Sequence, residues 1–97
     1  MNALDRHHET VASLGCLVCK RIGKGYSAAQ LHHVAEASGK RSDWSVVPLC
    51  PTHHDPHRTG SGFHGMGTKK FCSMFRLPGE SEYGLLVWLL EDLAKAK

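Results

Sequence analysis

The sequence predicts a small α+β domain, in which zinc cross-links a strand–loop–strand–helix unit that has helices on either side. Three observations lead to this prediction. The chain has 97 residues, which is near the low end for a core held by burial alone. It contains four Cys and eight His, which suit zinc or another borderline metal. These residues are grouped as Cys-x-x-Cys at 16–19, His-His at 32–33 and Cys-x-x-His at 50–53.

Composition excludes several classes of protein. No run approaches the roughly 20 apolar residues of a membrane span, and residues 1–5 lack the features of a signal peptide. Four Cys beside eight His, without an export signal, favour metal-bound thiolates in a reducing cytoplasm over disulfides. We therefore expect a cytoplasmic protein of one domain, residues 1–97, with its core at about 14–76 and a C-terminal helix at about 81–95.

Positive charge is concentrated in the middle of the chain. Residues 20–76 hold nine Lys and Arg against three acids, a net +6, whereas the two ends sum to −3. A phosphate backbone is the natural partner of such a field. A merely solvated basic face is the alternative.

Residues 2–14 form a weakly helical segment, whose His7 and His8 we interpret as surface histidines.

The Cys residues predict a closed structural zinc site. Cys16-x-x-Cys19 could be a redox dithiol or half of a zinc site. The glycines at 23 and 25 argue against an immediate helix and so favour zinc. The partner half is Cys50-x-x-His53, which completes a Cys3His set, and His54 could replace His53.

The His pair lies on a predicted strand, residues 28–35. Neighbours on a strand face opposite sides, so one of His32 and His33 can bind a metal while the other stays free as a base. Two exposed histidines on an edge are the alternative. A polar loop at 36–45 returns through Val46 and Val47 to Cys50, and Pro51 suits the first turn of a helix.

The remaining segments are a loop and two helices. Residues 58–67 are rich in glycine and predict a loop. A short helix begins at Thr68, with Cys72 as a core thiol, and stops at 77–79. The last helix, capped near Ser81, contains six consecutive apolar residues at 85–90. Either the core buries both sides of it or one side contacts a second copy, which would make a homodimer.

In their order and spacing, these motifs resemble the HNH branch of the ββα-metal (His-Me finger) nucleases, and within it the phage Ref-like, RecA-dependent nucleases. The resemblance covers about residues 14–76 and is carried by Cys16-x-x-Cys19, His32-His33, the loop 39–43, Cys50-x-x-His53-His54, and residues 62–65 before a helix with Phe71.

The resemblance implies a role for each candidate residue. His33 is then the general base, and His32 and His54 bind the catalytic metal, with His64 favoured over His57 as third ligand. The family's middle residue, often Asn, supports the loop that holds the base; Asp43 is the nearest candidate here. The phosphate-binding residues would be Lys40, Arg41, Arg58, Lys69 and Lys70.

The sequence is therefore interpreted as a metal-dependent DNA endonuclease of low sequence specificity. A neutral imidazole can take a proton from water, and a divalent ion can stabilise the phosphoryl oxygens. The cofactors would be a structural Zn²⁺ and a catalytic Mg²⁺, Mn²⁺, Ni²⁺ or Zn²⁺. The resemblance implies a recombinase-type partner and a bacterial or phage-infected host. The alternative is a non-catalytic zinc module that binds nucleic acid or protein, and a thiol redox protein is a weaker third.

Overall fold

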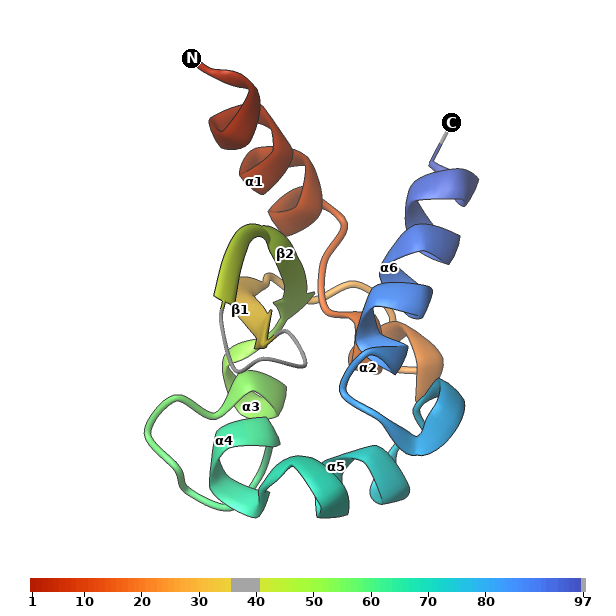
Figure 1. Ribbon diagram of the computed structural model, residues 1–97. Helices are drawn as coiled ribbons and strands as arrows, with labels where there is room; N and C mark the ends of the chain where they lie inside the picture. The colour runs from red at the N-terminus through yellow and green to blue at the C-terminus, as the bar shows by residue number, and fades with distance from the viewer. Residues whose placement is uncertain (36–40, 97) are drawn as a thin grey trace.

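The computed structural model describes residues 1–35 and 41–96, in an α+β arrangement around a two-stranded sheet (Figure 1). Lys40 therefore lies outside the described residues, and only the backbone of Arg41 is described. The elements, in chain order, are α1 (Ala3–Ser13), α2 (Leu17–Arg21), β1 (Gln30–Ala35), β2 (Arg41–Leu49), α3 (Pro51–His54), α4 (Phe63–Met66), α5 (Thr68–Met74), the 3-10 turn η1 (Pro78–Glu80) and α6 (Gly84–Lys95).

The sheet is an antiparallel hairpin in which His32 lies opposite Val47 and His33 opposite Val46. The pairing is irregular between His33 and Ala35. We expected a loop as far as residue 45, but β2 begins at Arg41, so that expectation was wrong for its last five residues. Their polar side chains had indicated a loop. Backbone pairing, which reaches back to Ala35 opposite Arg41, extends the strand through them.

The core lies between the sheet and the helices that cover it. Its fully buried side chains come from every layer: Val11 of α1, Leu17 of α2, Val46 and Val47 of β2, Phe71 of α5 and Leu85 of α6. Helices α1 and α6 both contact β2. Both extend toward the same end of the molecule, where the two chain termini lie (Figure 1). Helices α3 and α4 lie at the opposite, lower end of the hairpin (Figure 1).

The Cys-x-x-Cys motif lies at the start of a short helix. Cys16 is the N-cap of α2, and its sulfur accepts a hydrogen bond from the Cys19 backbone N–H. The expectation that no helix follows immediately was wrong, because α2 begins directly after Cys16 and continues to Arg21. Gly23, with a φ of 85°, lies just beyond the end of this helix. The argument for zinc therefore depends on the position of the second half-site and not on the local sequence.

One face of α6 belongs to the core and carries the buried residues Leu85, Trp88, Leu89 and Asp92. Val87 and Leu90 on the other side are 46% and 65% exposed. The predicted homodimer through this helix stays a prediction. In the described part of the chain, no helix has the length and apolar character needed to span a membrane.

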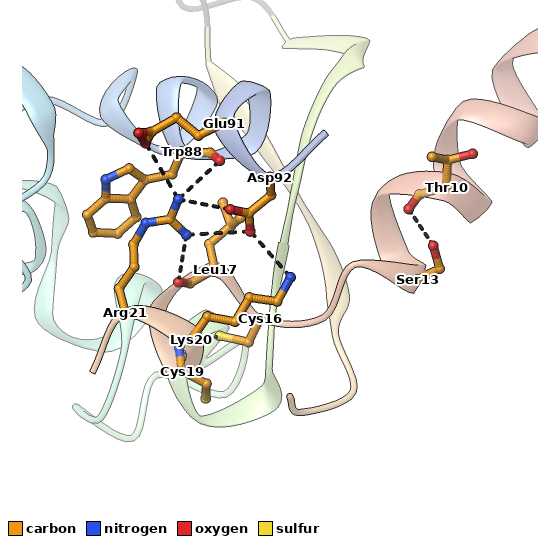
Figure 2. A network of polar contacts seen from close by, with 10 residues as sticks. All are labelled: Thr10, Ser13, Cys16, Leu17, Cys19, Lys20, Arg21, Trp88, Glu91 and Asp92. Atoms are coloured by element: carbon orange, nitrogen blue, oxygen red, sulfur yellow. Dashed lines mark hydrogen bonds and ion pairs between the residues drawn. The ribbon is translucent and has the colours of Figure 1, made fainter. Parts of the chain in front are cut away.

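A network of polar contacts joins α6 to α2 (Figure 2). The Arg21 guanidinium lies 3.0 Å from Asp92 Oδ1, donates to the Leu17 and Trp88 carbonyls, and lies 4.6 Å from the centre of the Trp88 ring. Lys20 Nζ lies 3.3 Å from Asp92 Oδ2. Because Asp92 is buried and the cations come from α2, this network fixes the C-terminal helix against the Cys-x-x-Cys motif.

Candidate metal centres

Within the described residues, two groups of His and Cys side chains converge as metal ligands would. The first group combines residues of α2 and α3, and its ligand atoms all lie within 4.8 Å of one another: Cys16, Cys19, Cys50 and His53. All four residues are buried. The Cys19 and Cys50 sulfurs are 3.7 Å apart, and His53 Nδ1 lies 3.2–3.5 Å from the three sulfurs. A tetrahedral zinc ion with Zn–S bonds of about 2.3 Å requires sulfurs at about this separation.

The environment of the first group favours a bound cation. Burial raises the pKa of the Cys16 thiol to about 12, because surroundings of low dielectric disfavour the thiolate. At Cys50, burial also acts to raise the pKa, but hydrogen bonds from the His53 backbone and from the neighbouring thiols outweigh it and lower the pKa. A metal ion would supply the positive charge that lets all three thiols ionise. The residues present therefore fit a structural zinc ion.

The second group consists of three histidines from β1, α3 and α4, namely His32, His54 and His64. Their ligand nitrogens also lie within 4.8 Å of one another, and their ring centres are 4.9–5.4 Å apart. The geometry thus separates two alternatives that spacing had left open. His53 faces the cysteines while His54 faces the other histidines, and His64 joins the group whereas His57 is exposed.

Two side chains outside this group form hydrogen bonds to His32 and His54. The Nε2 of His32 lies 3.0 Å from Glu82 Oε2, and His54 Nδ1–H donates to Gln30 Oε1 at 2.9 Å. Burial, together with the neighbouring His32 and His64, lowers the pKa of His54 to about 4. His54 is therefore neutral at physiological pH, as a metal ligand must be.

Asp55 organises the loop that carries His64. It ends α3 in a left-handed conformation, and its carboxylate accepts hydrogen bonds from the Thr59 N–H and hydroxyl and from the Gly60 and Gly62 N–H groups. Although burial acts to raise the pKa of Asp55, these bonds keep it well below its usual value. A Cβ at Gly65 would collide with the Asp55 carboxylate, so α4 can pack directly on this loop. The sequence signal for this loop is an Asp followed, four to six residues later, by Thr, Gly and Ser.

The predicted base, His33, faces away from its neighbour His32. Its side chain is 34% exposed, whereas that of His32 is 3% exposed, as alternation on β1 predicts. Its Nε2 lies 3.4 Å from Asp43 Oδ1. His8 Nε2–H donates to the Asp43 carbonyl at 2.6 Å, and His7 Nε2–H to the Trp44 carbonyl at 2.9 Å. His7 and His8 thus tie α1 to β2, which their interpretation as simple surface histidines did not include.

Three predicted phosphate-binding residues are described in full, and all are exposed. Arg58 follows α3, and Lys69 and Lys70 lie in the first turn of α5. The two lysines line an open groove together with Met66, Thr68, Ser73 and Met74. Because α4 carries His64 and runs into α5, this groove follows directly on the element that completes the histidine group.

Comparison with known proteins gave one result. Residues 3–94 match the model of a protein family described as "Recombination enhancement, RecA-dependent nuclease". No curated protein and no solved structure shows a significant match to the sequence.

Proposed function

Because the chain belongs to the family of recombination-enhancement, RecA-dependent nucleases, we propose that it is a metal-dependent DNA endonuclease of the HNH (ββα-metal) type. The observation that carries the proposal is the group of His32, His54 and His64, built on a strand–strand–helix unit in which His33 follows His32. A binding module that uses zinc only for stability needs four ligands, and the cysteine group already provides them.

In this proposal His33 is the general base. It is partly exposed, so water can reach it, and Asp43 supports the ring from one side. The Asp43 carboxylate near Nε2 favours the tautomer with its hydrogen there, which leaves Nδ1 to accept a proton from water. Asp43 would thus orient the base directly, and the contact from His8 to the Asp43 carbonyl holds this residue in turn.

His32, His54 and His64 would hold the catalytic divalent ion, which as a Lewis acid stabilises the charge that develops on the phosphoryl oxygens. Three imidazoles suit Mn²⁺, Ni²⁺ or Zn²⁺ better than Mg²⁺, which prefers oxygen ligands. Cys16, Cys19, Cys50 and His53 would hold the structural zinc. The first group stabilises the fold, and the second supplies the chemistry.

The substrate in this proposal is DNA, bound through its backbone. Arg58, Lys69 and Lys70 are exposed, and with Lys40 and Arg41 they would contact phosphates. Such contacts position the nucleic acid but carry no sequence information, so low sequence specificity is expected. The family description also names RecA, and a recombinase of that type is the proposed protein partner.

The first test is nicking of supercoiled plasmid by zinc-retaining protein with added Mn²⁺, Ni²⁺, Zn²⁺ or Mg²⁺. His33→Ala should lower the rate by about 10²–10⁴-fold, the usual contribution of a general base. The exposed His57, outside both groups, gives a matched control in His57→Ala, which should cut like wild type. Both variants should keep one zinc per chain and bind DNA.

Two results would contradict the proposal. Equal cutting by wild type and His33→Ala would remove His33 as the base. If the protein cuts no form of DNA with any of these metals while it retains zinc and binds nucleic acid, the non-catalytic zinc module becomes the better description. The closed Cys3His group is the observation that favours this second candidate, since it is complete without the histidine group.

A further inference from the structure

Glu82 is a partly buried contact of the histidine group that comes from a distant part of the chain. It lies in the short segment between η1 and α6, fifty residues after His32. Its side chain is 18% exposed, and its Oε2 lies 3.0 Å from the Nε2 of His32, whose side chain is 3% exposed. A carboxylate accepts and does not donate, so Nε2 must carry the hydrogen of this bond.

The hydrogen bond determines which nitrogen of His32 is left over. With Nε2 protonated and bonded to Glu82, a neutral ring has its lone pair on Nδ1. We propose that Glu82 is a positioning residue for the histidine group: it holds the His32 ring in the Nε2–H tautomer, so that Nδ1 is the metal ligand. The inference rests on the proposed function only in that it takes His32, His54 and His64 as the ligands of a divalent ion.

A buried imidazole needs an acceptor in any protein, so the contact alone does not indicate a metal. The contact at His54 adds the second observation. There Gln30 Oε1 accepts from Nδ1–H, which leaves Nε2 with the lone pair. Two of the three rings thus have one nitrogen bonded to a side chain outside the group, and one nitrogen of each ring lies within 4.8 Å of those of the other two. This is how metal-binding histidines are arranged: the nitrogen that does not bind the metal donates to a carboxylate or another acceptor.

The backbone around Glu82 is well fixed, which a positioning residue requires. The Gly84 N–H donates to the Ser81 carbonyl, and the Leu85 N–H donates to the Glu82 carbonyl. Gly84 packs so closely on Pro78 that a Cβ would come within 2.6 Å of the Pro78 carbonyl oxygen. At the far end of α6, Asp92 is bound by Arg21. The helix therefore holds Glu82 against His32 as a rigid part of the fold.

The test measures metal binding without DNA. Protein with one zinc in the cysteine group is titrated with further Zn²⁺, and long-range ¹H–¹⁵N spectra of the imidazoles report which nitrogen is protonated and which binds the ion. In wild type, His32 should be the Nε2–H tautomer before titration and should coordinate through Nδ1 afterwards. Glu82→Ala should weaken the second zinc by about 10–100-fold, the usual effect of removing such a partner, and should yield a mixture of tautomers. Glu82→Gln keeps an acceptor and should restore the single tautomer.

Glu80 provides the control, because it is exposed at the end of η1, two residues before Glu82, and Glu80→Ala should bind the second zinc like wild type. Coordination of His32 through Nε2, or wild-type affinity and a single tautomer in Glu82→Ala, would overturn the inference. These results are separate from the proposed function. A protein that binds the second zinc as described but cuts no DNA would contradict only the nuclease proposal, and one that cuts DNA while Glu82→Ala binds zinc normally would contradict only this inference.

Discussion

His53 and His54 are consecutive residues, yet they belong to different groups of ligands. Neighbours on a helix point about 100° apart, so α3 presents one ring to the buried sulfurs and the next to His32 and His64. The two groups therefore lie on two sides of one helical turn. A small movement of α3 would displace ligands of both.

The pKa of His54 predicts how stability depends on pH. The folded pKa of about 4 is below the ordinary 6.5, so between these values the unfolded chain takes up a proton that the folded chain does not. The contribution of this ring to the free energy of unfolding is thus complete above pH 6.5 and is lost as the pH falls toward 4. The free energy of unfolding can be measured in urea at pH 7 and at pH 5, without added metal for the histidine group. Its fall from pH 7 to pH 5 should be about 1 kcal/mol smaller in His54→Gln than in wild type.

The control for this measurement is His57→Gln, which removes an exposed histidine and should keep the wild-type dependence on pH. Equal losses in wild type and His54→Gln would show that another group is responsible. Burial also lowers the pKa of His53.

Sequence reasoning at this scale predicted the members of the two groups but not the residues that contact them. All seven residues of the two groups were candidates, because Cys and His at short spacings stand out in any chain. Spacing could not decide between His53 and His54 or between His57 and His64, since that depends on the path of the loop after α3. Glu82 and Gln30 were missed because their partners are fifty and twenty-four residues away.

At the scale of elements, the connection between α2 and α6 depends on one buried carboxylate. Asp92 is 8% exposed and bonded to Arg21 and Lys20, whereas Glu91 beside it is 52% exposed and lies 3.6 Å from Arg21. Asp92→Asn should therefore lower the free energy of unfolding by about 2 kcal/mol, because it removes the buried one of the two carboxylates that pair with the partly buried Arg21. Urea denaturation measures this loss.

Glu91→Gln is the matched control, since it removes one charge from the same guanidinium at an exposed position. It should cost less than about 0.5 kcal/mol. Equal effects of the two substitutions would mean that burial of Asp92 does not strengthen the pair. Neither substitution touches a candidate ligand, so zinc content should stay at one per chain in both.

The elements were predicted well where hydrophobic pattern determines them. The first helix, expected at 2–14, lies at Ala3–Ser13, and the first strand, expected at 28–35, lies at Gln30–Ala35. The pattern failed at short elements. Helix α4 lies inside the glycine-rich stretch that we interpreted as a loop, so that interpretation was wrong for residues 63–66. Gly65 is present there because α4 packs closely on Asp55, and not because the chain must be flexible.

At the scale of the whole molecule, the cysteine group brings two distant segments together. The cysteine group joins residues 16–19 to residues 50–53 and so encloses β1 and β2. Zinc binding in such sites contributes about 10–16 kcal/mol, as much as the whole stability of a typical small domain. Removal of zinc by a strong chelator should therefore unfold the chain, with loss of its helical circular dichroism and of its cooperative thermal transition.

Readdition of Zn²⁺ should restore both signals, and a chelated protein that still melts cooperatively would contradict the structural role of this group. The buried Cys72, outside the group, provides the comparison in zinc content. Cys72→Ala should keep one zinc per chain, whereas Cys50→Ser should lose it. The α+β class was predictable from the chain as a whole. The two halves of the cysteine group, at 16–19 and 50–53, could be paired with each other, and the residues between them had the pattern of two strands.

The order of the ligands along the chain has a consequence for synthesis. The last residue of the cysteine group along the chain is His53, and the last residue of the histidine group is His64. Glu82 comes after both. A ribosome therefore makes every ligand of the structural ion before the last histidine that the proposed cutting site needs. The nascent chain can acquire its zinc and its hairpin while it still lacks a complete reactive centre.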